Sequence, residues 1–140
     1  MIVEKTFAEI HEGDTAQFEV AITDALVQTF SDLSGDSNPL HMDAVYAQET
    51  SLKKRVAHGM LGGAFLSRLV GMQLPGKHSL YLSQSLLFKK PVHLGTTVVV
   101  SGTVIQKIES MSTVKIATII RDTATGEILT DGEALVKVLL

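Results

Sequence analysis

The sequence predicts an α+β protein in which an antiparallel sheet wraps around one long apolar helix. Two observations carry this prediction. The stretch GMLGGAFLSRLVGMQL, residues 59–74, has the length of a helix and few polar residues on any side. Most of the chain after it is rich in β-branched residues or alternates between apolar and polar ones, as strands do. A helix that is apolar all round must be covered, and a sheet that curls around it is the simplest cover.

The segment before the apolar helix is expected to hold a strand and two shorter helices. Residues 16–23 alternate loosely and end at a helix-start signal. Residues 24–34 carry apolar side chains at helical spacing, and Gly35 is placed to end that helix. Asp43 is a good N-cap for a short helix through residues 44–50.

The segment after the apolar helix is expected to supply four more strands. They are residues 79–88, 96–110, 111–122 and 127–140, with a turn at 123–126 between the last two. Gly102 predicts a bulge or bend in the second of them. About five strands around an apolar helix make the hot-dog fold. The edges of one such sheet are open, and edge-to-edge pairing of two copies closes one of them, so a homodimer is expected.

Three glycines lie inside the apolar helix, Gly62, Gly63 and Gly71. Each costs ~1 kcal/mol against alanine in a helix interior. They therefore indicate a close approach by the sheet, by a partner helix or by a ligand.

Composition narrows the function further. The 140 residues are enough for one domain, residues 1–140, and the net charge of −3 comes without a broad basic face, so nucleic-acid binding is not expected. The absence of cysteine excludes a disulfide, a thiolate metal site and a cysteine nucleophile. The apolar helix contains Arg68 and is shorter than the ~20 residues of a membrane span, and the N-terminus lacks the pattern of a signal peptide. A cytoplasmic protein without membrane contact is expected.

The stretch SGDSNPLH, residues 34–41, is the first candidate for chemistry. It places Asp36 and His41 on either side of Asn38, Pro39 and Leu40, and Gly35 directly precedes Asp36. Gly35, Asn38 and Pro39 restrict the backbone of this turn. Leu40 is expected to anchor the loop in the core. A rigid shell around two titratable groups is what acid/base chemistry needs. A plain capped turn is the alternative for an isolated sequence of this kind.

The stretch AHGM, residues 57–60, opens the apolar helix and supplies a third part. The first N–H groups of a helix have no intrahelical partner and lie at the positive end of its dipole. Gly59 has no side chain to obstruct a ligand carbonyl. Asp36, His41 and the Gly59 N–H together fit proton transfer and water chemistry next to a polarised carbonyl. The spacing of the acid and the histidines fits no common metal-ligand pattern.

These segments resemble a known family. FSDLSGDSNPLHMDAVYA followed by VAHGMLGGAFLSRLVGMQLPG is similar to the MaoC-like, or (R)-specific enoyl-CoA hydratase, family, and the similarity is densest over residues 30–95. The resemblance implies a dimeric hot-dog hydro-lyase without a metal or redox cofactor. It would add water to trans-2-enoyl thioesters of coenzyme A to give (R)-3-hydroxyacyl thioesters. Asp36 and His41 would activate the water, and the Gly59 N–H would bind the thioester oxygen.

Weaker candidates surround this core. The resemblance implies that Ser67 supports the catalytic pair, whereas a bond back to its own helix is the structural alternative. Gly63 and Val70 share helical spacing with Ser67 and are candidates for an acyl pocket, against core packing as the alternative. Asn38 is a supporting residue of the turn. His58 is expected to serve structure rather than catalysis.

Several functions stay open at this stage. A 3-hydroxyacyl-acyl-carrier-protein dehydratase would use the same site in reverse. A hot-dog thioesterase is disfavoured because residues 59–74 contain no Asp or Glu, although such enzymes often carry a carboxylate on this helix. A non-catalytic acyl-thioester-binding subunit is the third possibility. The acyl chain length and the choice of base between Asp36 and His41 also stay open.

Overall fold

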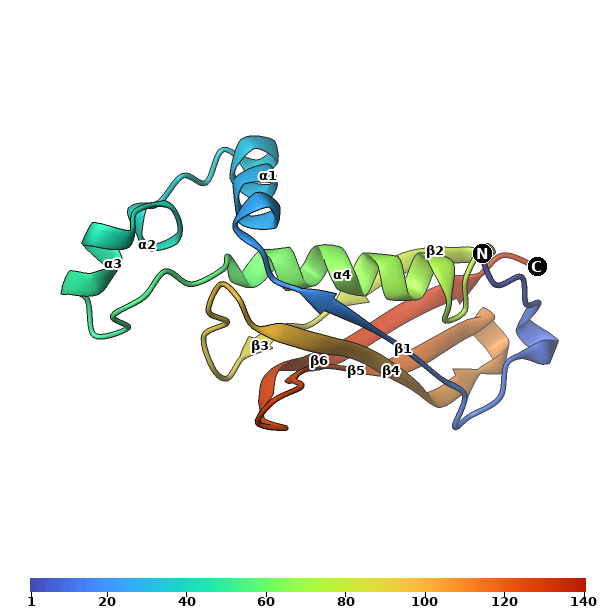
Figure 1. Ribbon diagram of the computed structural model, residues 1–140. Helices are drawn as coiled ribbons and strands as arrows, with labels where there is room; N and C mark the ends of the chain where they lie inside the picture. Colours follow the sequence, from blue (N-terminus) through green and yellow to red (C-terminus); the bar gives the residue numbers. More distant parts are fainter.

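The structure, a computed structural model that describes residues 1–140, confirms the predicted architecture (Figure 1). The strands are β1 (Thr15–Ala21), β2 (Ser79–Gln84), β3 (Leu87–Phe88), β4 (Thr97–Ile108), β5 (Thr113–Asp122) and β6 (Ile128–Val138). The helices are α1 (Asp24–Ser34), α2 (Pro39–Met42), α3 (Ala44–Glu49) and α4 (Gly59–Met72), with short 3-10 turns η1 (Phe7–Glu9) and η2 (Glu109–Met111). The apolar helix is therefore α4, and it ends two residues earlier than predicted.

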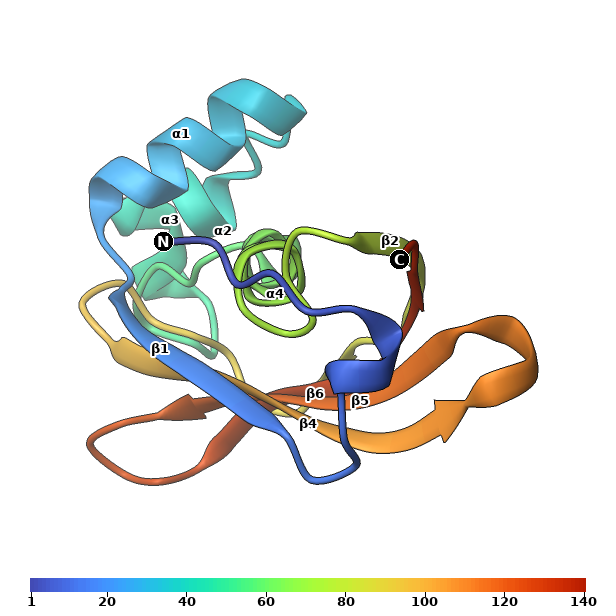
Figure 2. The ribbon, with the colours of Figure 1, turned by 90° about the vertical axis from the view of Figure 1, so that its right-hand side faces the viewer.

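The sheet is antiparallel throughout and curls around α4, which is the hot-dog fold. Its strands follow the order β1-β4-β5-β6-β2, and the short β3 also pairs with β6. Figure 2, which looks along the helix axis, shows the sheet passing beneath α4 and rising beside it at β2. The two ends of the sheet, β1 and β2, are open edges.

The core lies between α4 and the concave face of the sheet. Leu61, Leu66 and Leu69 belong to a first cluster of buried side chains that also contains residues of β4, β5 and β6. Val70 belongs to a second cluster, near the other end of the sheet. The opposite face of α4 is not covered within one chain: Met60 is 57% exposed. None of the helices combines the length and the hydrophobicity that a transmembrane helix requires.

The helix glycines differ in what they approach. A Cβ built on Gly62 would lie 2.9 Å from Ile120 Cδ1, so the sheet approaches the helix closely there. A Cβ on Gly63 would meet Leu86 at an ordinary 3.7 Å, and a Cβ on Gly71 would meet nothing within 4 Å. The expectation of a close approach is confirmed at Gly62 and is not met at Gly71 within one chain.

The predicted strand 79–88 is broken in the structure. It forms β2 and β3, and both pair with β6. At the break the Ser85 N–H donates to Glu133 O at 2.9 Å, and the Ser85 carbonyl oxygen lies 1.9 Å from where a Cβ of Gly132 would be. The two backbones cross so closely that the regular ladder cannot continue, a tertiary effect with no signal in residues 79–88.

The predicted bulge at Gly102 is wrong in position. Gly102 pairs regularly with Ala16 on β1 and Thr118 on β5, and the register shift of β4 falls between Val104 and Gln106. A Cβ on Gly102 would lie 3.0 Å from Leu69 Cδ2 and 3.0 Å from Ile116 Cγ2. Glycine is used here because α4 crosses the sheet at this point, not because the strand bends.

Gly102→Val is accordingly expected to destabilise the protein by about 1–3 kcal/mol, the usual cost of overpacking a filled core. Urea unfolding followed by circular dichroism measures the change in the free energy of unfolding. Thr103→Val is the control, because residue 103 is adjacent in β4 and only partly buried. Equal stability of the two variants would contradict the close crossing of α4 over Gly102.

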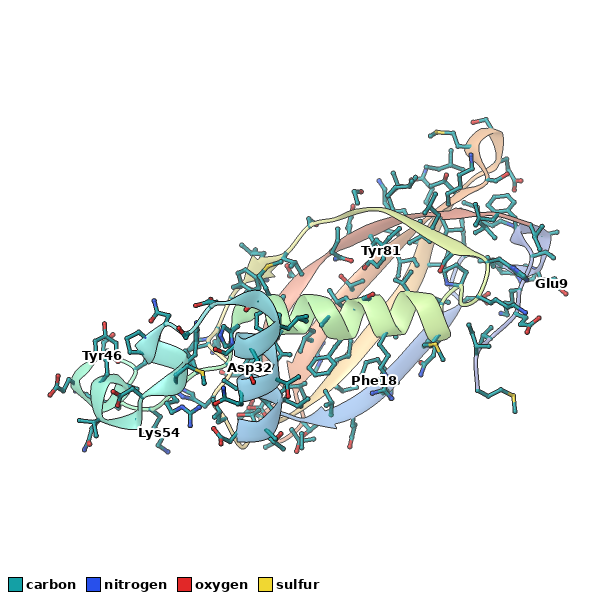
Figure 3. All side chains as sticks on the ribbon, turned by 90° about the horizontal axis from the view of Figure 1, so that it is seen from above. Glu9, Phe18, Asp32, Tyr46, Lys54 and Tyr81 are labelled. Carbon is teal, nitrogen blue, oxygen red and sulfur yellow. The ribbon has the colours of Figure 1, made fainter.

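The three remaining helices lie together beyond the start of α4. Figures 1 and 3 show α1, which carries Asp32, crossing that end of α4, while Tyr46 of α3 and Lys54 lie farther out. Residues 35–38 connect α1 to α2 in this region. The helix start of α4 therefore faces the SGDSNPLH segment, and the candidate site lies between them.

Candidate active site

The turn at residues 35–38 is held by its own sequence. Gly35 ends α1 with a left-handed φ of 79°, and its N–H donates to Ser31 O at 2.8 Å. Asn38 is extended, with φ −53° and ψ 131°, and its Oδ1 accepts from the Leu40 N–H at 2.9 Å. Pro39 follows as the first residue of α2, a position that needs no N–H donor. The predicted rigid turn is confirmed.

Two details of this turn differ from the prediction. His41 does not lie in the predicted loop but in the short helix α2, which begins directly after Asn38. Leu40 does not anchor the loop in the core, since it stays partly exposed and outside both core clusters. Met42 packs against the first cluster instead. Because residues 39–42 form a helical turn, the side chain of Met42 rather than that of Leu40 points toward the core. The prediction of a loop at these residues did not include this turn.

Asp36 presents its carboxylate at the surface of the turn. Its Oδ1 accepts from the Asn38 N–H at 3.1 Å, and its own N–H donates to Ser34 Oγ at 3.1 Å. The side chain is 50% exposed. The second carboxylate oxygen, Oδ2, lies 4.0 Å from His58 Nε2. One oxygen of Asp36 thus stabilises the turn, and the other stays available.

His41 is held by two contacts with residues just before α4. Its Nδ1 lies 2.7 Å from Val56 O. A carbonyl oxygen only accepts, so Nδ1 carries a proton, and the neutral ring keeps a free lone pair on Nε2. Its main-chain oxygen accepts from Arg55 Nε, and Arg55 Nη1 pairs with Asp24 Oδ1 at 2.8 Å. The ring is therefore oriented with Nε2 free to take a proton.

His58 joins this pair, which the sequence did not indicate. Its ring lies over the His41 ring, with centroids 3.9 Å apart, and its Nε2 lies 2.8 Å from Asp36 O. Asp36, His41 and His58 each have one oxygen or nitrogen atom that could bind a metal ion, and these three atoms lie within 4.8 Å of one another. Two of the imidazole nitrogens, His41 Nδ1 and His58 Nε2, already hydrogen-bond to main-chain carbonyls. The cluster is therefore better suited to acid/base chemistry than to holding a metal ion.

Gly59 opens α4 directly beside this cluster. As the first residue of the helix, its N–H has no intrahelical acceptor, and it lies at the positive end of the helix dipole. Gly59 is exposed, and a Cβ built on it would lie 2.8 Å from Phe88 Cε1. The Phe88 ring therefore packs directly against Gly59, and a side chain at this residue would collide with it.

A cavity of about 350 Å³ starts at this point and extends toward the core. His58 and Gly59 line it, as do Lys89 and Lys90. Its apolar wall consists mainly of Ile22, Leu61, Phe65, Val92, Val98 and Ile120. An apolar cavity that begins at a polar cluster and a helix N-terminus can hold a hydrocarbon chain with its carbonyl end at Gly59.

The remaining predicted residues lie farther along α4. Ser67 is about 12 Å along the helix axis from Gly59. It is exposed, and within one chain its hydroxyl bonds neither to the catalytic pair nor back to its own helix. Val70 is 1% exposed inside the second core cluster. Gly63, Ser67 and Val70 do not line the cavity. In one chain the structure brings together Asp36, His41 and Gly59, but not these three.

The fold and the site define a class: a hot-dog protein with an Asp–His pair beside the N-terminus of its central helix, where His58 and Gly59 line an apolar cavity. Comparison with known proteins gives the family. Residues 6–125 match the family described as MaoC like domain, and the chain belongs to this family.

Individual relatives agree with this assignment. The chain is 39% identical over 132 residues to the (R)-specific enoyl-CoA hydratase of Rhodospirillum rubrum, covering 94% of this chain and 90% of the relative. It is 40% identical over 125 residues to the enzyme of the same name from Aeromonas caviae, covering 89% and 92%. The solved structure of R-hydratase PhaJ1 from Pseudomonas aeruginosa superimposes with a TM-score of 0.90 at 39% identity, covering 95% of this chain and 84% of that one.

Proposed function

We propose that the protein is an (R)-specific enoyl-CoA hydratase, a hydro-lyase that adds water to trans-2-enoyl thioesters to give (R)-3-hydroxyacyl thioesters. The proposal rests on the position of Asp36 and His41, each of which has a polar side-chain atom within 4.8 Å of one on His58. His58 and the next residue, Gly59, line an apolar cavity. Relatives with this activity in their names cover most of the chain. All of residues 1–140 are proposed as one domain, since the sheet uses strands from residue 15 to residue 138.

In the proposed mechanism, Asp36 and His41 activate the water, and the Gly59 N–H binds the thioester oxygen. A water held between Asp36 Oδ2 and His41 Nε2 loses a proton to this pair while its oxygen bonds to C3 of the enoyl group. Electron density moves through the conjugated system to the thioester oxygen, where the Gly59 N–H stabilises the developing charge. The proton is then delivered to C2, which completes the addition of water. Asp36 and His41 act on the same water and therefore form one acid/base unit.

The same site catalyses the reverse reaction, because a catalyst does not change an equilibrium constant. The alternative function is therefore a 3-hydroxyacyl dehydratase, acting on coenzyme A or acyl-carrier-protein thioesters. Lys89 and Lys90 line the cavity next to Gly59, which favours a phosphate-bearing carrier. They pair with Asp131 and Glu127, so their charge is partly compensated. A cytoplasmic location remains a prediction from the sequence.

Ultraviolet absorbance of crotonyl-CoA tests the proposed function directly. Hydration removes the conjugated double bond, and the absorbance of the enoyl thioester falls. We expect the wild-type protein to cause this loss and the product to be the (R) enantiomer on chiral analysis. If crotonyl-CoA and longer enoyl-CoAs are all left unchanged while an enoyl-acyl-carrier-protein is hydrated, the carrier in the proposal is wrong. No turnover of any of them would favour the non-catalytic binding subunit.

We also propose that two copies pair through the β2 edge of the sheet. The two edges differ in character: the exposed positions of β1 include Gln17 and Glu19, whereas β2 exposes Leu80 at 50% and Leu82 at 46%. Charged and polar edges discourage pairing, and apolar edges favour it. β2 lies next to the uncovered face of α4 in Figure 2. In this dimer the role proposed for Ser67, on that face, and the pocket role of Gly63 depend on the partner copy, whereas Val70 stays buried in its own chain.

Leu80→Lys is expected to shift this dimer to the monomer, because a lysine at the β2 edge opposes pairing and removes buried apolar area. Analytical ultracentrifugation measures the change in molar mass. Gln17→Lys places the same charge on the β1 edge and is expected to leave the dimer intact. Dissociation by Gln17→Lys alone would move the interface to β1.

A further inference from the structure

His58 is buried in a way that core packing does not explain. Its side chain is almost fully buried, with 4% of the residue exposed, and its Nδ1 has no hydrogen-bond partner. A buried ring nitrogen without a partner costs free energy, whereas an apolar side chain of similar size would pack there without that penalty. A histidine at this position therefore needs another reason.

The other ring nitrogen of His58 supplies that reason. His58 Nε2 lies 2.8 Å from the main-chain oxygen of Asp36. Because the carbonyl only accepts, Nε2 donates, which fixes the tautomer and leaves the unpartnered Nδ1 without a proton in the neutral ring. The remaining hydrogen bonds of Asp36 go to Ser34 and Asn38, within its own turn. The bond from His58 is the one that connects Asp36 to the start of α4.

The His58 ring also limits the orientation of His41. The two ring centroids are 3.9 Å apart with an interplanar angle of 33°, and Phe30 packs against His58 at 4.8 Å. His41 is already tied by Nδ1 to Val56 O, two residues before His58. With one ring bonded at its edge and covered by another ring, His41 Nε2 is held in one direction.

We propose that His58 is a positioning residue that fixes Asp36 and His41 relative to the Gly59 N–H, a role that rests on the proposed function. His58 precedes Gly59 directly, so one rigid residue connects the water-activating pair to the thioester-binding donor. The proton on His58 Nε2 stays on that nitrogen, and His58 takes no part in proton transfer. His58 contributes by holding Asp36 and His41 in place, because a solvent-exposed turn alone would leave them more mobile.

Two substitutions separate the hydrogen bond from the packing. His58→Gln places an amide N–H donor near the position of Nε2, whereas His58→Met fills the space without any donor. A displacement of about 1 Å in reacting groups costs on the order of 10²-fold in rate. We expect kcat on crotonyl-CoA to fall about that much in His58→Met, with a smaller effect on KM, and to stay within about tenfold of wild type in His58→Gln.

A second measurement does not depend on activity. Amide hydrogen exchange of residues 35–38 reports the restraint on the Asp36 turn, and we expect faster exchange in His58→Met than in wild type or His58→Gln. Thermal unfolding verifies that the variants are folded. If His58→Met does not fold, His58→Phe, which keeps a ring without a donor, takes its place with the same expectations.

The outcomes separate this inference from the proposed function. Wild-type kcat in His58→Met, equal losses in the Met and Gln variants, or unchanged exchange at residues 35–38 would each overturn the role of His58. If wild type hydrates no enoyl thioester, the proposed function fails, and the exchange measurement alone decides whether His58 positions the turn.

Discussion

Asp36→Asn and His41→Asn are each expected to lower kcat by about 10²–10⁴-fold, the contribution of a positioned general acid or base. Asparagine at residue 36 keeps an oxygen that accepts from the Asn38 N–H at 3.1 Å, so the turn is preserved while the negative charge is lost. Asparagine at residue 41 keeps a donor for Val56 O in place of Nδ1 and removes Nε2. Both changes remove the acid/base group and retain the local hydrogen bonds.

Asp43→Asn is the matched control for these variants. Asp43 caps α3 by accepting from the Val45 and Tyr46 N–H groups, and asparagine caps a helix about as well as aspartate. Steady-state kinetics on crotonyl-CoA are therefore expected to be nearly unchanged in Asp43→Asn. If Asp36→Asn retained wild-type kcat with a normal unfolding temperature, the water would have to be activated elsewhere, and the proposed site would be wrong.

Local chemistry made one part of the site predictable. The turn at residues 35–38 is built by a left-handed glycine, an Asx bond and a proline, and each acts within a few residues of sequence. The donor at Gly59 follows from a helix start, which the apolar pattern of residues 59–74 places within a residue or two. Asp36, His41 and Gly59 could therefore be selected from sequence, although their spatial convergence could not be derived from spacing.

Tertiary contacts made the rest unpredictable. The hydrogen bond between His58 and Asp36 joins residues 22 positions apart, and nothing in the sequence around either residue predicts it. The break between β2 and β3 depends on Gly132 meeting the backbone of Ser85, which requires the register of β6. Helical spacing from Ser67 made Val70 a candidate for the acyl pocket, but the curl of the sheet buries Val70 in the second core cluster. Periodicity identifies a face of a helix, and only the fold decides what that face meets.

Removal of the Gly59 N–H is expected to lower kcat by about 10²–10³-fold, the loss that deletion of one oxyanion-hole donor causes in other enzymes. Proline is the substitution that removes it. Residue 59 is the first of α4, where proline is well tolerated, and His58 already has the extended backbone, φ −58° and ψ 131°, that a residue before proline adopts. The obstacle is Phe88, whose ring lies 2.8 Å from the position of a Cβ at residue 59.

The experiment is therefore made in a Phe88→Ala background, which clears the space for a side chain at residue 59. Gly59→Ala in that background keeps the N–H and adds the Cβ, and Gly59→Pro in the same background loses the N–H. The ratio of their kcat values on crotonyl-CoA isolates the donor from the steric change. If the proline variant turns over as fast as the alanine variant, the thioester oxygen is not bound at Gly59. The next free donor of the helix start, the Met60 N–H, would then be the group to test, because it shares the same dipole and the same unpartnered position.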